Sequence, residues 1–168
     1  RIHRKIQRQM GADYQAEVPL KTEIVCDGFT LKIEGRADGL IHTKEQVMVD
    51  EIKGVLRELD RVQEPAGIHL AQAKCYASMV AEQEGVDEIG VQMTYCQMET
   101  EEVKRFQYSY QSNELKVWFD EVIRQYKKWA KFQIEWRKAR NASIKGIEFP
   151  FPYRKGQRDL AVSVYRTI

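Results

Sequence analysis

The chain has 168 residues, of which 43% are hydrophobic and 31% charged, and its formal net charge is +2. This composition excludes an intrinsically disordered chain, and no apolar run is long enough to cross a membrane. The length predicts one domain, or one domain with the start of another, around a core of substantial size. Three cysteines without a C-x-x-C pair predict reduced thiols in a cytoplasmic protein.

The hydrophobic periodicity predicts helices and strands that alternate along the chain. The expected elements are a helix over 1–10, a β-meander over 17–42 that turns at Asp27-Gly28, a strand over 45–54, a helix over 67–85, and strands over 88–98 and 103–111. A long helix is expected over 114–140, with one apolar side formed by Leu115, Trp118, Val122, Tyr126 and Trp129. This order predicts an α/β domain with a mixed β-sheet flanked by helices.

Charged residues interrupt the hairpin that these patterns predict. Asp38 lies near the end of one strand, while Glu51 and Lys53 are two residues apart on the next and therefore point the same way. Two carboxylates from adjacent strands beside one ammonium group suit a hard divalent cation such as Mg²⁺, which also binds substrate phosphate oxygens. Asp50, by contrast, is expected at a solvated strand end.

The helix expected over 67–85 carries a polar face. His69, Gln72 and Tyr76 follow one another at i, i+3 and i+7, so they share this face, which is expected to meet a polar group. We do not include His69 in the catalytic set. Glu17 is a candidate for a supporting role in the site, although a surface glutamate at the start of a strand is the favoured interpretation.

Four sequence elements together resemble a known family. "GRAD", with Asp38, and "DEIK", with Glu51 and Lys53, resemble the core motif of the PD-(D/E)XK nuclease superfamily in its RecB-like branch. "QAKCY" supplies the Q-x-x-x-Y signature of that branch through Gln72 and Tyr76. "RIHRKIQ" places His3 where this branch often has a histidine on its first helix.

The resemblance implies a restriction-endonuclease-like core and metal-dependent hydrolysis of phosphodiester bonds. Asp38, Glu51 and the backbone carbonyl of Ile52 would bind Mg²⁺ or Mn²⁺, and His3 would complete the metal shell. Lys53 would orient the attacking water or help to deprotonate it. The remaining signature residues, Gln72 and Tyr76, would steady the site or contact the DNA strand.

A second resemblance concerns the end of the chain. "FPFPYRKGQRDLAVSVYRTI", from Phe149 onward, resembles the segment that opens the helicase core in the XPD and DinG family. In that family Arg154, Gly156 and Gln157 would belong to the element that recognises adenine. The resemblance implies a nuclease domain over 1–145, followed over 146–168 by a linker and the start of a helicase core within a longer chain.

These resemblances predict a cytoplasmic exonuclease that acts on DNA single strands or ends together with a fused helicase. One alternative is a non-catalytic module of the same fold that binds DNA or docks the helicase. Another is a metabolite- or nucleotide-processing enzyme whose carboxylate pair is coincidental.

Overall fold

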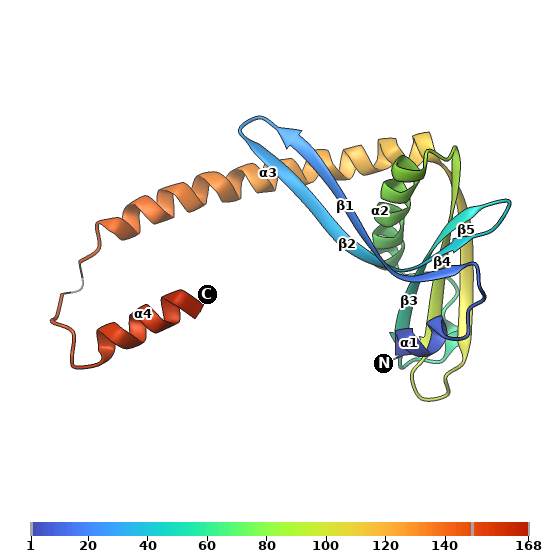
Figure 1. Ribbon diagram of the computed structural model, residues 1–168, viewed down its shortest axis with the longest axis horizontal. Helices are drawn as coiled ribbons and strands as arrows, with labels where there is room; N and C mark the ends of the chain where they lie inside the picture. Colours follow the sequence, from blue (N-terminus) through green and yellow to red (C-terminus); the bar gives the residue numbers. More distant parts are fainter. Residues whose placement is uncertain (1, 149, 168) are drawn as a thin grey trace. The chain divides into compact units, whose positions relative to one another are not determined.

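The computed structural model describes residues 2–148 and 150–167 (Figure 1). The chain forms two compact units, residues 1–123 and residues 124–168. Phe149, where the segment resembling a helicase core begins, lies outside the described residues.

The first unit is built on a five-stranded mixed sheet in the order β1-β2-β3-β4-β5. The strands β3 and β4 are parallel and all other neighbours are antiparallel. Its elements are α1 (Ile2–Gln7), β1 (Tyr14–Cys26), β2 (Phe29–His42), β3 (Val47–Val55), a 3₁₀ turn (Leu59–Arg61), α2 (Gly67–Glu84), β4 (Glu88–Gln97), β5 (Val103–Gln111) and the first part of α3 (Ser112–Lys145). The parallel pair needs a crossover, and α2 supplies it.

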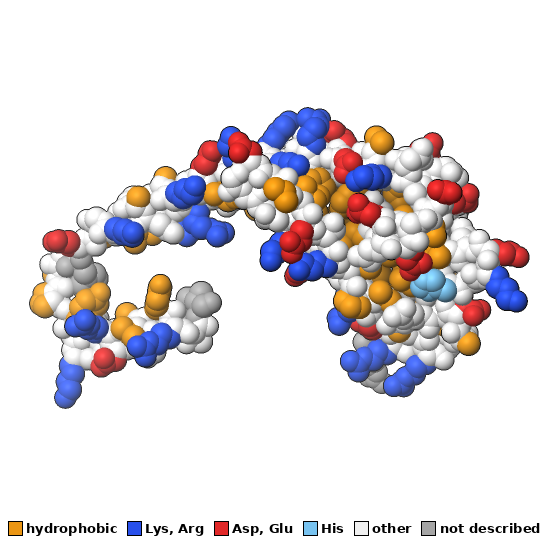
Figure 2. Space-filling view, turned by 45° about the horizontal axis from the view of Figure 1, so that its top comes forward, with side chains coloured by type: hydrophobic (Ala, Val, Ile, Leu, Met, Phe, Trp, Pro, Cys, Tyr) orange, Lys and Arg blue, Asp and Glu red, His pale blue; other side chains and the backbone are white. Residues whose placement is uncertain are grey.

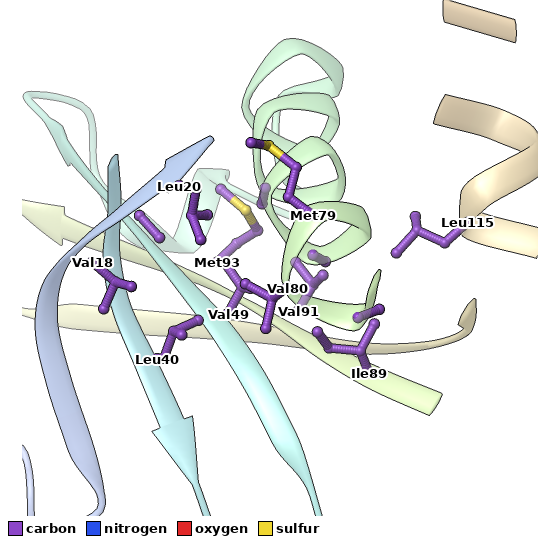
Figure 3. Close-up of a cluster of buried hydrophobic side chains, with 14 of the residues drawn as sticks. Val18, Leu20, Leu40, Val49, Met79, Val80, Ile89, Val91, Met93 and Leu115 are labelled. Atoms are coloured by element: carbon purple, nitrogen blue, oxygen red, sulfur yellow. The ribbon is translucent and has the colours of Figure 1, made fainter. Parts of the chain in front are cut away.

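The main core lies between the sheet and α2. Met79 and Val80 of α2 face Val49 of β3 and Met93 of β4, and all four side chains are buried (Figure 3). The apolar run Val47–Val49 of β3 suits these positions because parallel strands inside a sheet are covered on both faces, and β4 is buried at every residue after Glu88. Gly85 ends α2 in the left-handed conformation, with φ of 67°.

A smaller cluster covers the opposite face of the sheet. Ile6 of α1 packs against Ile52 of β3 and Cys96 of β4. Successive side chains on a strand point to opposite faces, so Ile52 faces α1 while Glu51 and Lys53 face α2. This alternation places the charged residues of β3 on the α2 side.

The predicted fold class, an α/β domain with a mixed sheet flanked by helices, is confirmed. The architecture is consistent with a restriction-endonuclease-like core. All the predicted elements are present, although β1 already begins at Tyr14 and α3 extends from Ser112 to Lys145.

The apolar side predicted for the long helix is only partly its buried side. Leu115 is buried, but the core contacts continue through Phe119 and Ile123, at i+4 and i+8. Tyr126 and Trp129 are instead 49% and 54% exposed. The helix carries two adjacent apolar stripes, and helical periodicity alone does not distinguish which of them packs on the sheet.

The second unit contains the remainder of α3 and the helix α4 (Gln157–Thr167), which follows Gly156 with φ of 83°. None of the described residues of α4 is buried. Among residues 2–148 and 150–167, no helix combines the length and apolar character needed to cross a membrane.

Candidate functional site

Asp38 and Glu51 lie on neighbouring antiparallel strands, as predicted. Gly39 of β2 pairs with Asp50 of β3, which places the preceding Asp38 beside the residues that follow Asp50. The backbone N–H of Ile52 donates a hydrogen bond of 2.8 Å to Asp38 Oδ2. The side chain of Asp38 is thereby held against the backbone of β3, with only 13% of it exposed.

The structure also brings His3 to this position. Its Nδ1 atom lies 3.1 Å from Asp38 Oδ1. The short helix α1 is anchored by the buried side chain of Ile6, and His3 precedes Ile6 by about one turn. A residue far from Asp38 in the sequence therefore lies beside its carboxylate.

Four of the predicted site residues form one hydrogen-bonded chain. Lys53 Nζ donates to Glu51 Oε1 at 2.7 Å and to Gln72 Oε1 at 3.0 Å. The other end of the same amide, Gln72 Nε2, donates to the Tyr76 hydroxyl at 3.2 Å. The polar face predicted for α2 thus meets the charged side of β3.

Tyr76 also explains the glycine that begins "GRAD". A Cβ atom added at Gly35 would lie 2.5 Å from Cε1 of the Tyr76 ring. The aromatic ring therefore lies directly against the backbone of β2, and a larger residue at Gly35 would displace it. Sequence reasoning noted both residues but did not connect them, because their contact spans two elements.

His69, which was left out of the catalytic set, has a structural partner. Its Nδ1 atom lies 2.9 Å from the Tyr95 hydroxyl, and this hydroxyl accepts the backbone N–H of Ala66 at 3.0 Å. Burial and the nearby Lys53 ammonium group lower the pKa of His69. The contact ties the first turn of α2 to β4.

Among the site residues, Glu51 has the least favourable environment for a charged side chain. Burial raises its pKa from 4.5 to about 7; the Lys53 hydrogen bond opposes this shift, and the Asp38 carboxylate adds to it. Its Oε2 atom is buried and is the only such side-chain polar atom in the described part of the chain without a hydrogen-bond partner. A buried acceptor without a partner is costly, and a bound cation would satisfy it.

The residues fit a divalent cation in their chemistry. Asp38 and Glu51 supply hard oxygen donors. The Oε2 atom of Glu51 accepts no hydrogen bond from the described residues, so its lone pairs are available to a cation. No group of three His, Cys, Asp or Glu side chains is gathered in metal-binding geometry within residues 2–148 and 150–167. In this arrangement both oxygens of Asp38 are engaged, one by Ile52 and one by His3.

Two further residues adjoin the site, namely Glu17, which the sequence offers as a supporting candidate, and Gln7, which the sequence does not single out. Glu17 has φ of 57° and is the one residue of β1 without a paired partner in β2, at the position opposite Asp38. Gln7 Nε2 donates to Glu17 Oε1 at 3.0 Å and to the backbone oxygen of Asp38 at 2.9 Å. A glutamate with positive φ has no signature in the sequence, so this conformation of Glu17 could not be predicted.

The prediction for Asp50 is wrong. Its side chain is fully buried rather than solvated. Asp50 Oδ1 accepts hydrogen bonds from Thr94 Oγ1 at 2.5 Å and Gln92 Nε2 at 3.0 Å, and Oδ2 accepts the Tyr14 hydroxyl at 3.0 Å. Burial raises the pKa of Asp50, against the opposing effect of these three hydrogen bonds. The parallel strand β4 supplies two of the donors, and strand alternation within β3 does not predict them.

The ring of Tyr14 lies against Gly39, the residue that pairs with Asp50, and leaves no room there for a side chain. A Cβ atom at Gly39 would lie 2.0 Å from Cζ of the Tyr14 ring, whose hydroxyl is held by Asp50. We expect Gly39→Ala to destabilise the protein by roughly 1–3 kcal/mol, because a held ring cannot move aside without losing its buried hydrogen bond. The measurement is urea unfolding. Gly11→Ala is the matched control, since nothing lies within 4 Å of a Cβ at Gly11; equal effects of the two changes would contradict the expectation.

Comparisons with known proteins give a limited result. No family model matches the chain, and no curated protein matches it. Among solved structures, the crystal structure of SSO0001 is similar with a TM-score of 0.45 and 19% sequence identity, over 68% of this chain and 52% of that one. The chain therefore spans about half the length of that structure. A likeness of this extent implies nothing about activity.

Proposed function

We propose that this protein is a metal-dependent nuclease that hydrolyses phosphodiester bonds of DNA with Mg²⁺ or Mn²⁺. The observation that carries the proposal is the hydrogen-bonded chain from Glu51 through Lys53 and Gln72 to Tyr76, together with Asp38 on the adjacent strand. These are the residues on which the resemblance to the RecB-like branch of the PD-(D/E)XK nucleases rests. Their proximity supports that resemblance independently of the spacing in the sequence.

The carboxylates of Asp38 and Glu51 and the backbone carbonyl of Ile52 would hold the cation, and His3 would join them. When bound, such a cation lowers the pKa of water and neutralises negative charge that develops on the phosphate. Asp38 is positioned for this role by the Ile52 N–H, which fixes one of its oxygens. To join the cation through Nδ1, His3 would release the other oxygen of Asp38.

Lys53 is the residue best placed to contact the substrate. Its ammonium group has three N–H donors, and two of them are directed to Glu51 and Gln72. The third can donate to a phosphate oxygen or to the attacking water. In hydrolysis the water oxygen bonds to phosphorus, the bond from phosphorus to the departing sugar oxygen breaks, and that oxygen takes up a proton. Lys53 would stabilise the charge on the phosphate during this exchange.

We further propose that the enzyme is a cytoplasmic exonuclease that acts on single strands or DNA ends. The resemblance of the last residues to the start of a helicase core supports this, because a helicase in the same longer chain would deliver separated strands. Gln72 and Tyr76, at the far end of the hydrogen-bonded chain from Glu51, would steady Lys53 or contact the strand.

The test compares linear single-stranded DNA, blunt duplex and a closed single-stranded circle, each with Mn²⁺ and with a chelator in parallel. We expect rapid loss of the linear strand, little loss of the other two, and no cutting with the chelator. Cutting of the circle at the same rate would contradict end dependence. DNA binding without cutting under any metal condition would instead favour the non-catalytic module, to which the engagement of both Asp38 oxygens already gives some support.

A further inference from the structure

The charge of the chain is divided unevenly between its two units. Residues 124–168 contain 12 Lys and Arg residues but only three Asp and Glu residues, whereas residues 1–123 contain 15 and 22. The formal charges are therefore +9 and −7, which the total of +2 conceals. A strongly basic segment in a near-neutral chain indicates a surface for a polyanion.

Four of these 12 basic residues lie in one line on α3. Arg124, Lys131, Lys138 and Lys145 follow one another at intervals of seven residues, and we call them the basic row. Seven residues are close to two helical turns, so the row drifts by only about 20° per interval and extends over roughly 30 Å. All four residues are exposed, and Figure 2 shows Lys and Arg side chains along this helix.

Three of the four residues in the basic row are not used in ion pairs with other described residues. In the part of the chain that the structure describes, Lys131, Lys138 and Lys145 form no ion pair. Lys127 and Lys131 form an i, i+4 pair of like charges, and such pairs destabilise a helix. The only acidic residue of α3 beyond Arg124 is Glu135. The arrangement therefore favours an external partner over internal pairing.

The opposite side of the same helix is aromatic. Tyr126, Trp129, Phe132 and Trp136 are each about half exposed, between 48% and 57%, and form an aromatic stripe. At 3.6 residues per turn this stripe lies about 160° around the axis from the basic row. If the stripe were buried in a lipid bilayer, the row would point away from the membrane. The partner of the row is therefore not a lipid surface bound through that stripe.

We propose that the basic row binds the sugar-phosphate backbone of a nucleic acid. A nucleic-acid backbone carries a continuous line of negative charge, which matches a straight row of cations better than the mixed charges of a protein surface do. Lysine suits this task because its ammonium group acts as a point charge toward phosphate without recognising bases. The proposal deepens the proposed function, on which it rests, by assigning a surface that holds the DNA substrate independently of the catalytic residues.

The test measures binding without cutting. A fluorescein-labelled single strand of about 20 thymidines is titrated with the whole chain in EDTA over a range of salt concentrations, and binding is followed by anisotropy. In the test variant, Lys131, Lys138 and Lys145 are all changed to Gln. The logarithm of the binding constant falls linearly with the logarithm of the salt concentration, and removing three phosphate contacts should make this slope less steep by about 2. Binding should weaken about 100-fold near 0.1 M salt. Circular dichroism verifies that the helix is retained.

Two matched variants identify the cause. Changing the same three lysines to Arg retains the charges and should preserve binding. Changing Lys21, Lys32 and Lys44 to Gln alters the net charge by the same amount outside α3 and should leave the slope nearly unchanged. The proposal is overturned if this control loses as much binding as the row variant, or if the row variant binds like the parent. Binding to vesicles containing phosphatidylserine is measured in parallel. The proposal is also overturned if the row variant loses binding to these vesicles but binds the single strand like the parent.

The result is separable from the proposed nuclease activity. A protein that fails to cut with any metal, but shows the expected salt slopes in EDTA, would retain the basic row as a nucleic-acid surface and refute the nuclease. A protein that cuts, but shows no effect of the row variant, would refute the basic row alone.

Discussion

Replacing Glu51 with glutamine is expected to reduce metal-dependent DNA cutting by more than about 100-fold, because even residues that only support a metal ligand often contribute 10- to 100-fold. Glu51 is one of two carboxylates proposed to hold the cation, and it also anchors Lys53. Glutamine is close to glutamate in shape, so the packing between β3 and α2 should survive. Activity is measured on the linear single strand with Mn²⁺.

The same variant should gain stability when no metal is present. Glu51 is charged at pH 8, yet its side chain is only 3% exposed and its Oε2 atom has no hydrogen-bond partner among the described residues. Removing the charge removes the desolvation penalty and the repulsion from Asp38. Glu34→Gln, at an exposed position of β2, is the control and should change neither property. A folded Glu51→Gln protein that cuts at the parental rate would refute the assignment of the site.

The metal-free protein is expected to lose stability as the pH rises from about 4.5 to about 7. The pKa of Glu51 is raised from 4.5 in an exposed chain to about 7 in the fold. Between these values the folded protein binds a proton that the unfolded chain has released, so each increase in pH favours unfolding. The loss is nearly complete about one pH unit above the pKa of the folded state, where Glu51 is deprotonated in both states. The shift corresponds to roughly 3 kcal/mol.

The measurement is urea unfolding in EDTA at several pH values, for the parent and for Glu51→Gln. Burial also raises the pKa of Asp50, which adds a contribution of the same sign, whereas the lowered pKa of His69 adds one of the opposite sign. The difference between the two proteins isolates Glu51, and only the parent should show the steeper decline. Adding Mn²⁺ at pH 8 should restore stability to the parent through binding, and much less so to the variant. Parallel pH profiles would show that Glu51 is not held in a desolvated state.

Several features of the site could be predicted from the sequence because they depend on one element at a time. Glu51 and Lys53 are two residues apart on a strand, so their side chains must share a face. Gln72 and Tyr76 are four residues apart on a helix and must also lie together. The hairpin that joins β2 to β3 brings Asp38 beside Glu51. These relations follow from backbone geometry.

Other features depend on which elements pack together. Asp50 is an ordinary strand-end charge by its sequence, and only the donors of β4 and Tyr14 of β1 make its burial possible. Glu17 lies opposite Asp38 at the one unpaired position of β1. Gln7 of α1 reaches this position and donates hydrogen bonds to Glu17 and to the backbone oxygen of Asp38. No local pattern encodes these contacts, since each joins residues from elements that are distant in the sequence.

By itself the sequence determined the order of the helices and strands from α1 to α3, the face on which each charged residue of β3 lies, and the local grouping of Lys53 with Glu51. Periodicity is sufficient for this, because it reflects the repeat of a single helix or strand. Only the tertiary structure decided that Asp50 is buried, that Glu51 Oε2 has no hydrogen-bond partner among the described residues, and that Phe119 and Ile123 rather than Tyr126 and Trp129 complete the core. Burial depends on what covers a face, and that covering comes from chain segments whose contacts no local repeat specifies.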